Sequence, residues 1–175
     1  MNAWVVRRLD APDVIERATE FVAVFAEVYR EPPYNEGEEQ FAGFARHLPG
    51  QAERPGFAMV IAEAPAGELI GFAFGTTFPP DQWWPGAGDE PEQLRGHARF
   101  GIMELLVRPQ WRGRKIGSAL MDLLLADRPE SYGALATNPQ ALATAIYRAW
   151  GWTSAGWFHP PHADPMEILV KPLHA

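Results

Sequence analysis

The residues from Glu104 to Leu120 combine a carboxylate, several cationic side chains and the start of a helix. The apolar run after Glu104 predicts a buried strand, and a basic turn leads from this strand into the helix. Amide groups at a helix N-terminus have no partner within the helix, and nearby arginine or lysine side chains complete an anion site. The turn matches neither G-x-x-x-x-G-K-[ST] nor G-x-G-x-x-G, the usual nucleotide-binding patterns. The residues therefore allow either a pyrophosphate site or an ordinary strand-to-helix turn.

The charge distribution favours a small anionic ligand at this turn. The 175-residue chain has 15 basic and 22 acidic side chains, and its formal net charge of −7 argues against binding to nucleic acid. Between Arg95 and Lys115, however, six cationic side chains stand against the single carboxylate of Glu104. A solvated basic turn is the alternative interpretation. The chain has no cysteine, which excludes a disulfide framework, a thiolate metal site and a thiol nucleophile.

Hydrophobic periodicity and turn residues predict the elements that position this turn. We expect helices at residues 10–29, 35–49, 116–128 and 138–151. We expect strands at residues 3–9, 57–63, 69–78, 98–107, 133–137, 153–158 and 166–173. The run of strand, helix and strand from residue 98 to 137 predicts a parallel crossover unit. No linker interrupts the pattern, so we expect one α+β domain over residues 1–175.

A long loop at residues 79–97 carries the adjacent tryptophans Trp83 and Trp84. These side chains could form a lid over a binding site, or they could pin the loop to the body of the protein. They could also be the centre of a partner-binding surface. A second loop contains His159 and His162, but two prolines separate them and we assign no metal site. A serine hydrolase is disfavoured because no serine lies in G-x-S-x-G.

Two motifs together resemble the GNAT superfamily of acyl-coenzyme A dependent N-acetyltransferases. The family's pyrophosphate turn reads Arg or Gln, two residues, Gly, one residue, then Gly or Ala. Arg112 and Gly117 match it, whereas Lys115 occupies the first glycine position. The second motif resembles the family's A-x-x-L-Y followed by G-F, and here it consists of Ala143, Ile146, Tyr147 and Gly151-Trp152.

The departures from the family pattern lead to specific expectations. If Lys115 is right-handed helical, its amide still faces a phosphate and its ammonium adds charge, so we expect the turn to tolerate it. Helical spacing places Tyr147 on the face of Ala143 and Thr144, away from a core face formed by Leu142, Ile146 and Ala149. The family often has Asn seven residues before this tyrosine, and Gln140 has that spacing here.

The resemblance implies a mixed, mostly antiparallel sheet of about seven strands, with about four helices and the fourth and fifth strands parallel. It implies direct transfer of an acetyl group from acetyl-coenzyme A, a co-substrate, to an amine of a small molecule or peptide. From the residues themselves we expect no metal, and no nucleic-acid or membrane partner, because the chain is acidic and the apolar run at residues 21–26 is too short to span a membrane. We interpret the protein as cytoplasmic, and exposed aromatic side chains are suited to a homodimer interface.

The resemblance also suggests a role for each site residue. Glu104 is the candidate general base, although an ion pair with Arg99 or Arg108 is the alternative, and Tyr147 is the candidate proton donor to the leaving thiolate. A backbone amide near Leu106 or Val107 stabilises the oxyanion. The expected coenzyme contacts are Leu105, Leu106, Val107, Arg112, Gly113, Arg114, Lys115, Ile116, Gly117, Ser118 and Gln140. A non-catalytic domain that binds acyl-coenzyme A is the alternative function.

Overall fold

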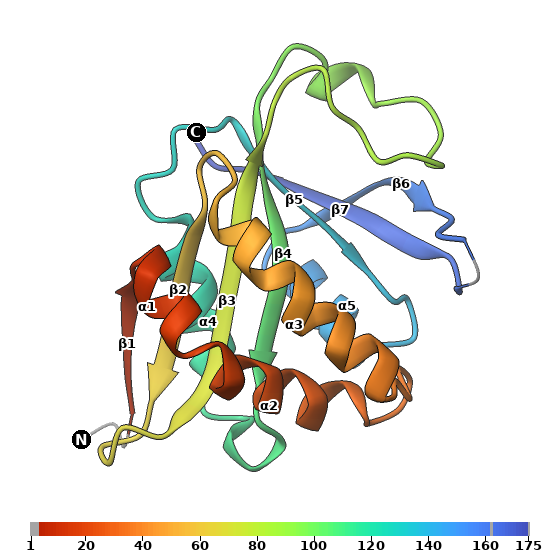
Figure 1. Cartoon of the computed structure of the whole chain (residues 1–175). Helices are drawn as coiled ribbons and strands as arrows, with labels where there is room; N and C mark the ends of the chain where they lie inside the picture. The colour runs from red at the N-terminus through yellow and green to blue at the C-terminus, as the bar shows by residue number, and fades with distance from the viewer. Residues whose placement is uncertain (1–3, 162, 175) are drawn as a thin grey trace. The chain divides into compact units, whose positions relative to one another are not determined.

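The computed structural model describes residues 4–161 and 163–174 (Figure 1). The chain divides into two compact units. The first contains the described residues up to Thr76 together with Ile102–Asp127, and the second contains Thr77–Gly101 and the described residues from Arg128 onward. The chain passes between them three times: within strand β3 (Leu69–Phe78), within strand β4 (Arg99–Val107), and between Asp127 and Arg128. The expected organisation as one domain over residues 1–175 stays a prediction.

The strands form one seven-stranded mixed sheet in the order β1-β2-β3-β4-β5-β7-β6. The other five strands are β1 (Val5–Leu9), β2 (Ala58–Glu63), β5 (Tyr132–Thr137), β6 (Thr153–Phe158) and β7 (Met166–Pro172). β4 and β5 are parallel, with Arg99 opposite Tyr132, whereas β1–β2, β2–β3, β5–β7 and β6–β7 are antiparallel. The expected α+β fold with a parallel fourth and fifth strand is confirmed.

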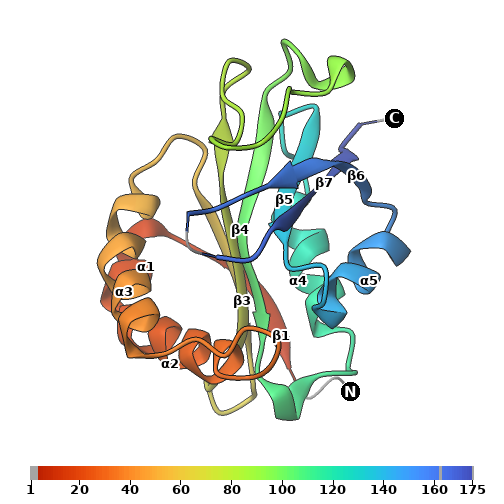
Figure 2. The same ribbon diagram turned by 90° about the vertical axis from the view of Figure 1, so that its right-hand side faces the viewer.

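Helices cover both faces of the sheet in the first unit. Figure 2 shows α1 (Ala11–Glu16), α2 (Ala18–Tyr29) and α3 (Glu38–Ala52) on one face of β1–β3, and α4 (Ile116–Leu125) on the other. The core between α1–α3 and the sheet is rich in aromatic rings, such as Phe21, Phe25 and Phe72. Phe25 also stacks on Phe44 of α3, with ring centroids 4.2 Å apart. This packing fixes α2 and α3 against the strands.

Several helix boundaries differ from the sequence expectation, and α4 also ends at Leu125, three residues earlier than expected. The expected helix at residues 10–29 is divided in two because Arg17 leaves helical geometry, with φ −95° and ψ 13°. The next helix begins after Gly37, not at Asn35, since the Gln40 side chain accepts a bond from the Gly37 amide. It also continues through Pro49 to Ala52, so this proline does not end it. Among the described residues, no helix is long and apolar enough to cross a membrane.

In the second unit, Arg99 organises the loop at residues 79–97. Its side chain is fully buried and is paired with Glu90. It also donates to the backbone carbonyl oxygens of Pro80, Gln82, Leu94 and His97, at 2.8–3.3 Å. The guanidinium lies 5.4 Å from the Trp83 ring centroid, and Trp83 and Trp84 pack against a cluster formed by Leu94, Ala134, Ile168 and Val170. This packing supports the interpretation that the two tryptophans hold the loop against the body of the protein.

Candidate functional site

Glu104 lies on β4 and is held by a tyrosine from the end of α2. The Tyr29 hydroxyl donates a hydrogen bond to Oε2 of Glu104, with an oxygen–oxygen distance of 2.5 Å. Glu36 lies in the connection to α3, and its amide donates to the Tyr29 carbonyl oxygen. The expected alternative, an ion pair of Glu104 with Arg99 or Arg108, is wrong because Arg99 pairs with Glu90 and Arg108 with Glu27.

The surroundings of Glu104 favour its neutral form. Burial raises the pKa of this carboxyl group, the hydrogen bond from Tyr29 lowers it, and the negative charge of Glu36 raises it again. The resulting pKa is about 8, compared with 4.5 for an ordinary glutamate. A carboxyl group with this pKa can accept a proton at neutral to mildly alkaline pH, which is where a general base is most effective.

A cavity of about 300 Å³ opens beside Glu104 in the first unit. One wall is α3, and the other walls are α2, β3 and β4. Most of the lining is apolar or aromatic, and the residues that form it are Phe25, Gln40, Gly43, Phe44, His47, Leu48, Gln51, Phe74, Met103 and Glu104. Apolar cavities with a few polar groups are typical of small-molecule sites. Glu104 is therefore in the position of a reactive group at the edge of a ligand site.

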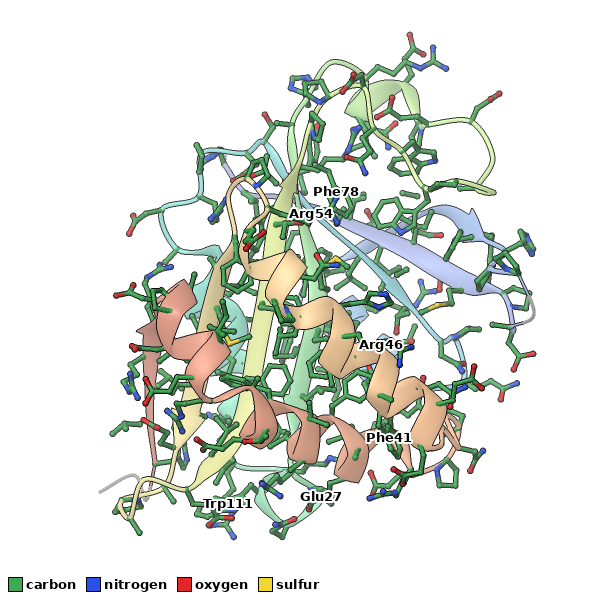
Figure 3. All side chains as sticks on the ribbon, in the orientation of Figure 1. Glu27, Phe41, Arg46, Arg54, Phe78 and Trp111 are labelled. Carbon is green, nitrogen blue, oxygen red and sulfur yellow. The ribbon has the colours of Figure 1, made fainter. Side chains whose placement is uncertain are left out.

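Two ion pairs connect the basic turn after β4 with α2 and the residues that follow it. Arg108 pairs with Glu27 of α2, and Nη1 of Arg112 lies 2.7 Å from Oε2 of Glu31, two residues after the end of α2. Figure 3 labels Glu27 on α2 and Trp111 on the turn that these pairs join. Arg112, Gly113, Arg114 and Lys115 are all exposed, and the Arg114 guanidinium lies 4.8 Å from the Trp111 ring centroid. The turn therefore presents cationic groups to solvent directly before α4 begins.

Lys115 does not have the right-handed helical conformation on which our expectation rested. It has φ 63° and ψ 15°, which is left-handed, and α4 starts one residue later at Ile116. A side chain is disfavoured in this region, whereas glycine adopts it at little cost. This position is the first glycine of the family pattern, so the structure gives a physical reason for that glycine. In this chain a lysine occupies the left-handed position.

We expect Lys115→Gly to raise the free energy of unfolding by about 0.5–1 kcal/mol, because it relieves the left-handed strain. Lys115→Ala is the matched control, since it removes the ammonium group but keeps the strain. Urea denaturation of the three proteins measures the effect. If the glycine and alanine variants are equally stable, the left-handed assignment is contradicted.

Tyr147 lies in the second unit, on α5 (Leu142–Ala149), and the expected orientation of this helix is wrong. Thr144 and Tyr147 are buried, whereas Leu142 and Ile146 are 77% and 39% exposed. The Thr144 hydroxyl lies 2.9 Å from that of Thr137 on β5, and the Tyr147 ring packs against Trp150 and Trp152. Tyr147 is thus on the core face of α5, where its ring is fixed by two indoles.

The segment before α5 is a turn and not the start of the helix. The Gln140 amide donates to Oδ1 of Asn138 at 2.9 Å, and the helix begins only at Leu142. Gln140 is exposed. His159 lies in the second unit and His162 lies outside the described residues. Within residues 4–161 and 163–174, no group of three or more His, Asp or Glu side chains could hold a metal ion.

Sequence reasoning missed two parts of this site. It did not identify Tyr29 as the partner of Glu104, which is 75 residues away in the chain. It also did not identify α3 as a cavity wall. The only indication in the sequence that α3 forms this wall is helical spacing, because residues three to four apart share a helix face. Gly43, Phe44, His47 and Leu48 have this spacing.

Residues 19–152 match the model of the Acetyltransferase (GNAT) family. No curated protein matches the chain significantly. Among solved structures, the PaiA N-acetyltransferase from Thermoplasma acidophilum, in complex with coenzyme A, has a TM-score of 0.67 at 16% identity, with 97% of this chain and 98% of that chain covered.

Two further structures have the same fold. The ribosomal-protein-S18-alanine N-acetyltransferase from Escherichia coli has a TM-score of 0.62 at 17% identity, with 98% of this chain and 95% of that chain covered. NAA60 from Arabidopsis thaliana, in complex with a bisubstrate analogue, has a TM-score of 0.63 at 16% identity, with 97% of each chain covered. At such low identity these similarities show the fold, while the family match covers most of the chain. The chain belongs to the GNAT family of acetyltransferases.

Proposed function

We propose that this protein transfers an acetyl group directly from acetyl-coenzyme A to an amine, with Glu104 as the general base. The observation that carries the proposal is a half-buried carboxyl group at the edge of an apolar cavity, bonded to Tyr29 and not to a cation. Membership of the GNAT family supports it, and so does the coenzyme A bound to the PaiA neighbour.

The first step is removal of a proton from the amine. An alkylammonium group has a pKa of about 10.4, so most of it is protonated at neutral pH and cannot attack a thioester. The Glu104 carboxylate accepts this proton, directly or through a water molecule. A bound cationic amine lowers the pKa of the neighbouring carboxyl group, so binding itself favours the ionised base.

The second step forms the amide bond. The amine nitrogen attacks the thioester carbonyl carbon, and the C–S bond breaks when the tetrahedral intermediate collapses. A backbone amide of β4 near Leu106 or Val107 donates to the oxyanion. The Tyr147 hydroxyl donates its proton to the leaving thiolate, and the second proton lost by the amine nitrogen returns to the Tyr147 phenolate. The proton held by Glu104 is then released to solvent. The products are an N-acetylated amine and coenzyme A.

We assign coenzyme binding to β4 and the turn that follows it. Leu105, Leu106 and Val107 bond the pantetheine arm as a neighbouring strand would. The pyrophosphate lies at the exposed turn and first turn of α4, formed by Arg112, Gly113, Arg114, Lys115, Ile116, Gly117 and Ser118. Gln140 is proposed as a further contact. Glu31 pairs with Arg112 in the described structure, so a bound pyrophosphate competes with this carboxylate.

We expect Arg112→Ala to weaken acetyl-coenzyme A binding by about tenfold or more, because a charge-assisted bond to phosphate is lost. The measurement is the rise in melting temperature with coenzyme concentration. Arg95→Ala is the control, since Arg95 is also exposed but lies in the loop of the second unit. An equal effect of both substitutions would show a general charge effect and contradict the assigned site.

Acetylation of an amine library, followed through released thiol, tests the whole proposal. Transfer to at least one amine supports it. Coenzyme binding without any transfer supports instead a non-catalytic acyl-coenzyme A binding domain. The cytoplasmic location, the absence of nucleic-acid and membrane partners, and a homodimer remain proposals from the sequence.

A further inference from the structure

The cavity beside Glu104 has a composition that selects among amines. Among its ten lining residues, Glu104 is the only carboxylate, and there is no lysine or arginine. Phe25, Leu48 and Phe74 are buried side chains of its wall, and Met103 is an exposed apolar side chain on β4. The remaining polar groups, Gln40, His47 and Gln51, come from α3.

We infer that the acceptor is a small primary amine with one uncharged apolar group, either an aromatic ring or a branched alkyl chain. This inference rests on the proposed function, since it names the substrate class of the same site. The ammonium group is placed at Glu104, and the apolar group occupies the cavity between α3 and the strands. The cavity volume of about 300 Å³ is at the lower end of the range for small-molecule sites. A cavity of this size can hold one ring but not a large sugar or a peptide.

A continuous series of rings connects the cavity with the carboxyl group. Phe44 stacks on Phe25 at 4.2 Å, and the Phe25 ring centroid is 4.4 Å from that of Tyr29, which bonds Glu104. An amine nitrogen at Glu104 therefore has aromatic surface beside the carbon atoms attached to it. Rings pack favourably against other rings, and burying apolar surface adds to binding.

The charges of the cavity argue against two other classes of amine. A polyamine has further ammonium groups, and any that enter the cavity would lie among phenylalanine rings, at a cost in desolvation. Glu36 acts electrostatically on Glu104, but it is not a lining residue and offers no carboxylate inside the cavity. An amino acid has a carboxylate, which would be repelled by Glu104. The lining contains no lysine or arginine to pair with it, and Arg46, whose side chain ends beside Gly43, is exposed to solvent. An amine with a single charge avoids both costs.

A panel of four acceptors tests this selection. We expect kcat/KM for 2-phenylethylamine to exceed that for spermidine and for phenylalanine by about tenfold or more. Phenylalaninamide is the matched control for phenylalanine, because it has the same shape without the carboxylate, and it should recover most of the lost activity. Spermidine or phenylalanine preferred over 2-phenylethylamine would overturn the inference while leaving acetyl transfer intact.

Two glycines of α3 give a matched pair of variants. Gly43 lines the cavity, and a Cβ atom there would meet only the end of the Arg46 side chain, at 3.8 Å. Gly50 lies in the same helix outside the cavity lining, and a Cβ atom there has nothing within 4 Å. Leucine favours helix more than glycine does, so both leucine variants should fold. Figure 3 labels Phe41 and Arg46 on α3, and Gly43 lies between them in the chain.

We expect Gly43→Leu to fill the cavity and lower kcat/KM for 2-phenylethylamine by about tenfold, with methylamine changed less than about twofold. Gly50→Leu should change neither. Binding of 2-phenylethylamine in the presence of coenzyme A, measured by saturation-transfer NMR, should be lost in Gly43→Leu alone. Equal binding and turnover in both variants would overturn the inference. Gly43-dependent binding without acetylation of any amine would overturn the proposed function but support the amine site.

Discussion

Replacing Glu104 by Gln should lower kcat/KM for acetyl transfer by about 10²- to 10³-fold, because a general base is removed. The amide keeps the size of the side chain and can still accept a bond from Tyr29, so the cavity is preserved. Acetyl-coenzyme A binding should remain, as measured by its effect on the melting temperature. Only the rate of amine acetylation should decrease.

The pH dependence gives an independent check of the same group. With a pKa of about 8, Glu104 is mostly protonated at pH 6 and mostly ionised at pH 9. Wild-type kcat/KM should therefore rise through this range of pH, and the rise should be absent in Glu104→Gln. Tyr29→Phe removes the hydrogen bond that lowers this pKa, so in this variant the rise of kcat/KM should occur at higher pH. A rise that is unchanged in both variants would show that another group titrates.

Stability should depend on pH through the same carboxyl group. Because its folded pKa is raised above the unfolded value of about 4.5, the folded state binds the proton more tightly. This contribution to stability is fully present below pH 4.5 and is lost as the pH rises to about 8. Glutamine cannot titrate. Glu104→Gln should therefore melt at a higher temperature than wild type at pH 9, with a smaller difference at pH 5.

Tyr147→Phe should lower kcat by about 10²-fold, because the leaving thiolate loses its proton donor. The phenylalanine ring still packs against Trp150 and Trp152, so the fold and coenzyme affinity should be retained. Tyr132→Phe is the control, since Tyr132 is a partly buried tyrosine of β5 in the same unit. Thiol release measures kcat, and the coenzyme-dependent melting shift measures binding. Unchanged turnover in Tyr147→Phe would remove this residue from the mechanism.

The sequence predicted the order of elements because hydrophobic periodicity and turn residues are local signals. The strands at residues 69–78 and 153–158 have the expected bounds, and the strand that carries Glu104 begins one residue later than expected. The basic turn before α4 also follows from local spacing. These features depend on residues that are close in the chain.

The features that could not be predicted depend on long-range packing or on backbone geometry. Leu142 and Ile146 look like a core face by their residue types, yet α5 buries Thr144 and Tyr147. A hydroxyl on β5 satisfies the buried Thr144 hydroxyl, and the sequence does not reveal this partner. The bond from Tyr29 to Glu104 likewise joins segments whose contact is set only by the packing of α2 on the sheet.

Arg99 has a consequence for engineering of the loop at residues 79–97. Four of its five bonding partners there are main-chain carbonyl oxygens, which every amino acid possesses. The anchor thus recognises the path of the backbone more than the identity of the residues along it. New sequences could be grafted between its contact points, provided that Glu90 and the packed side chains of Trp83, Trp84 and Leu94 are kept. The sequence of the loop can therefore vary while Arg99 continues to hold its backbone in place.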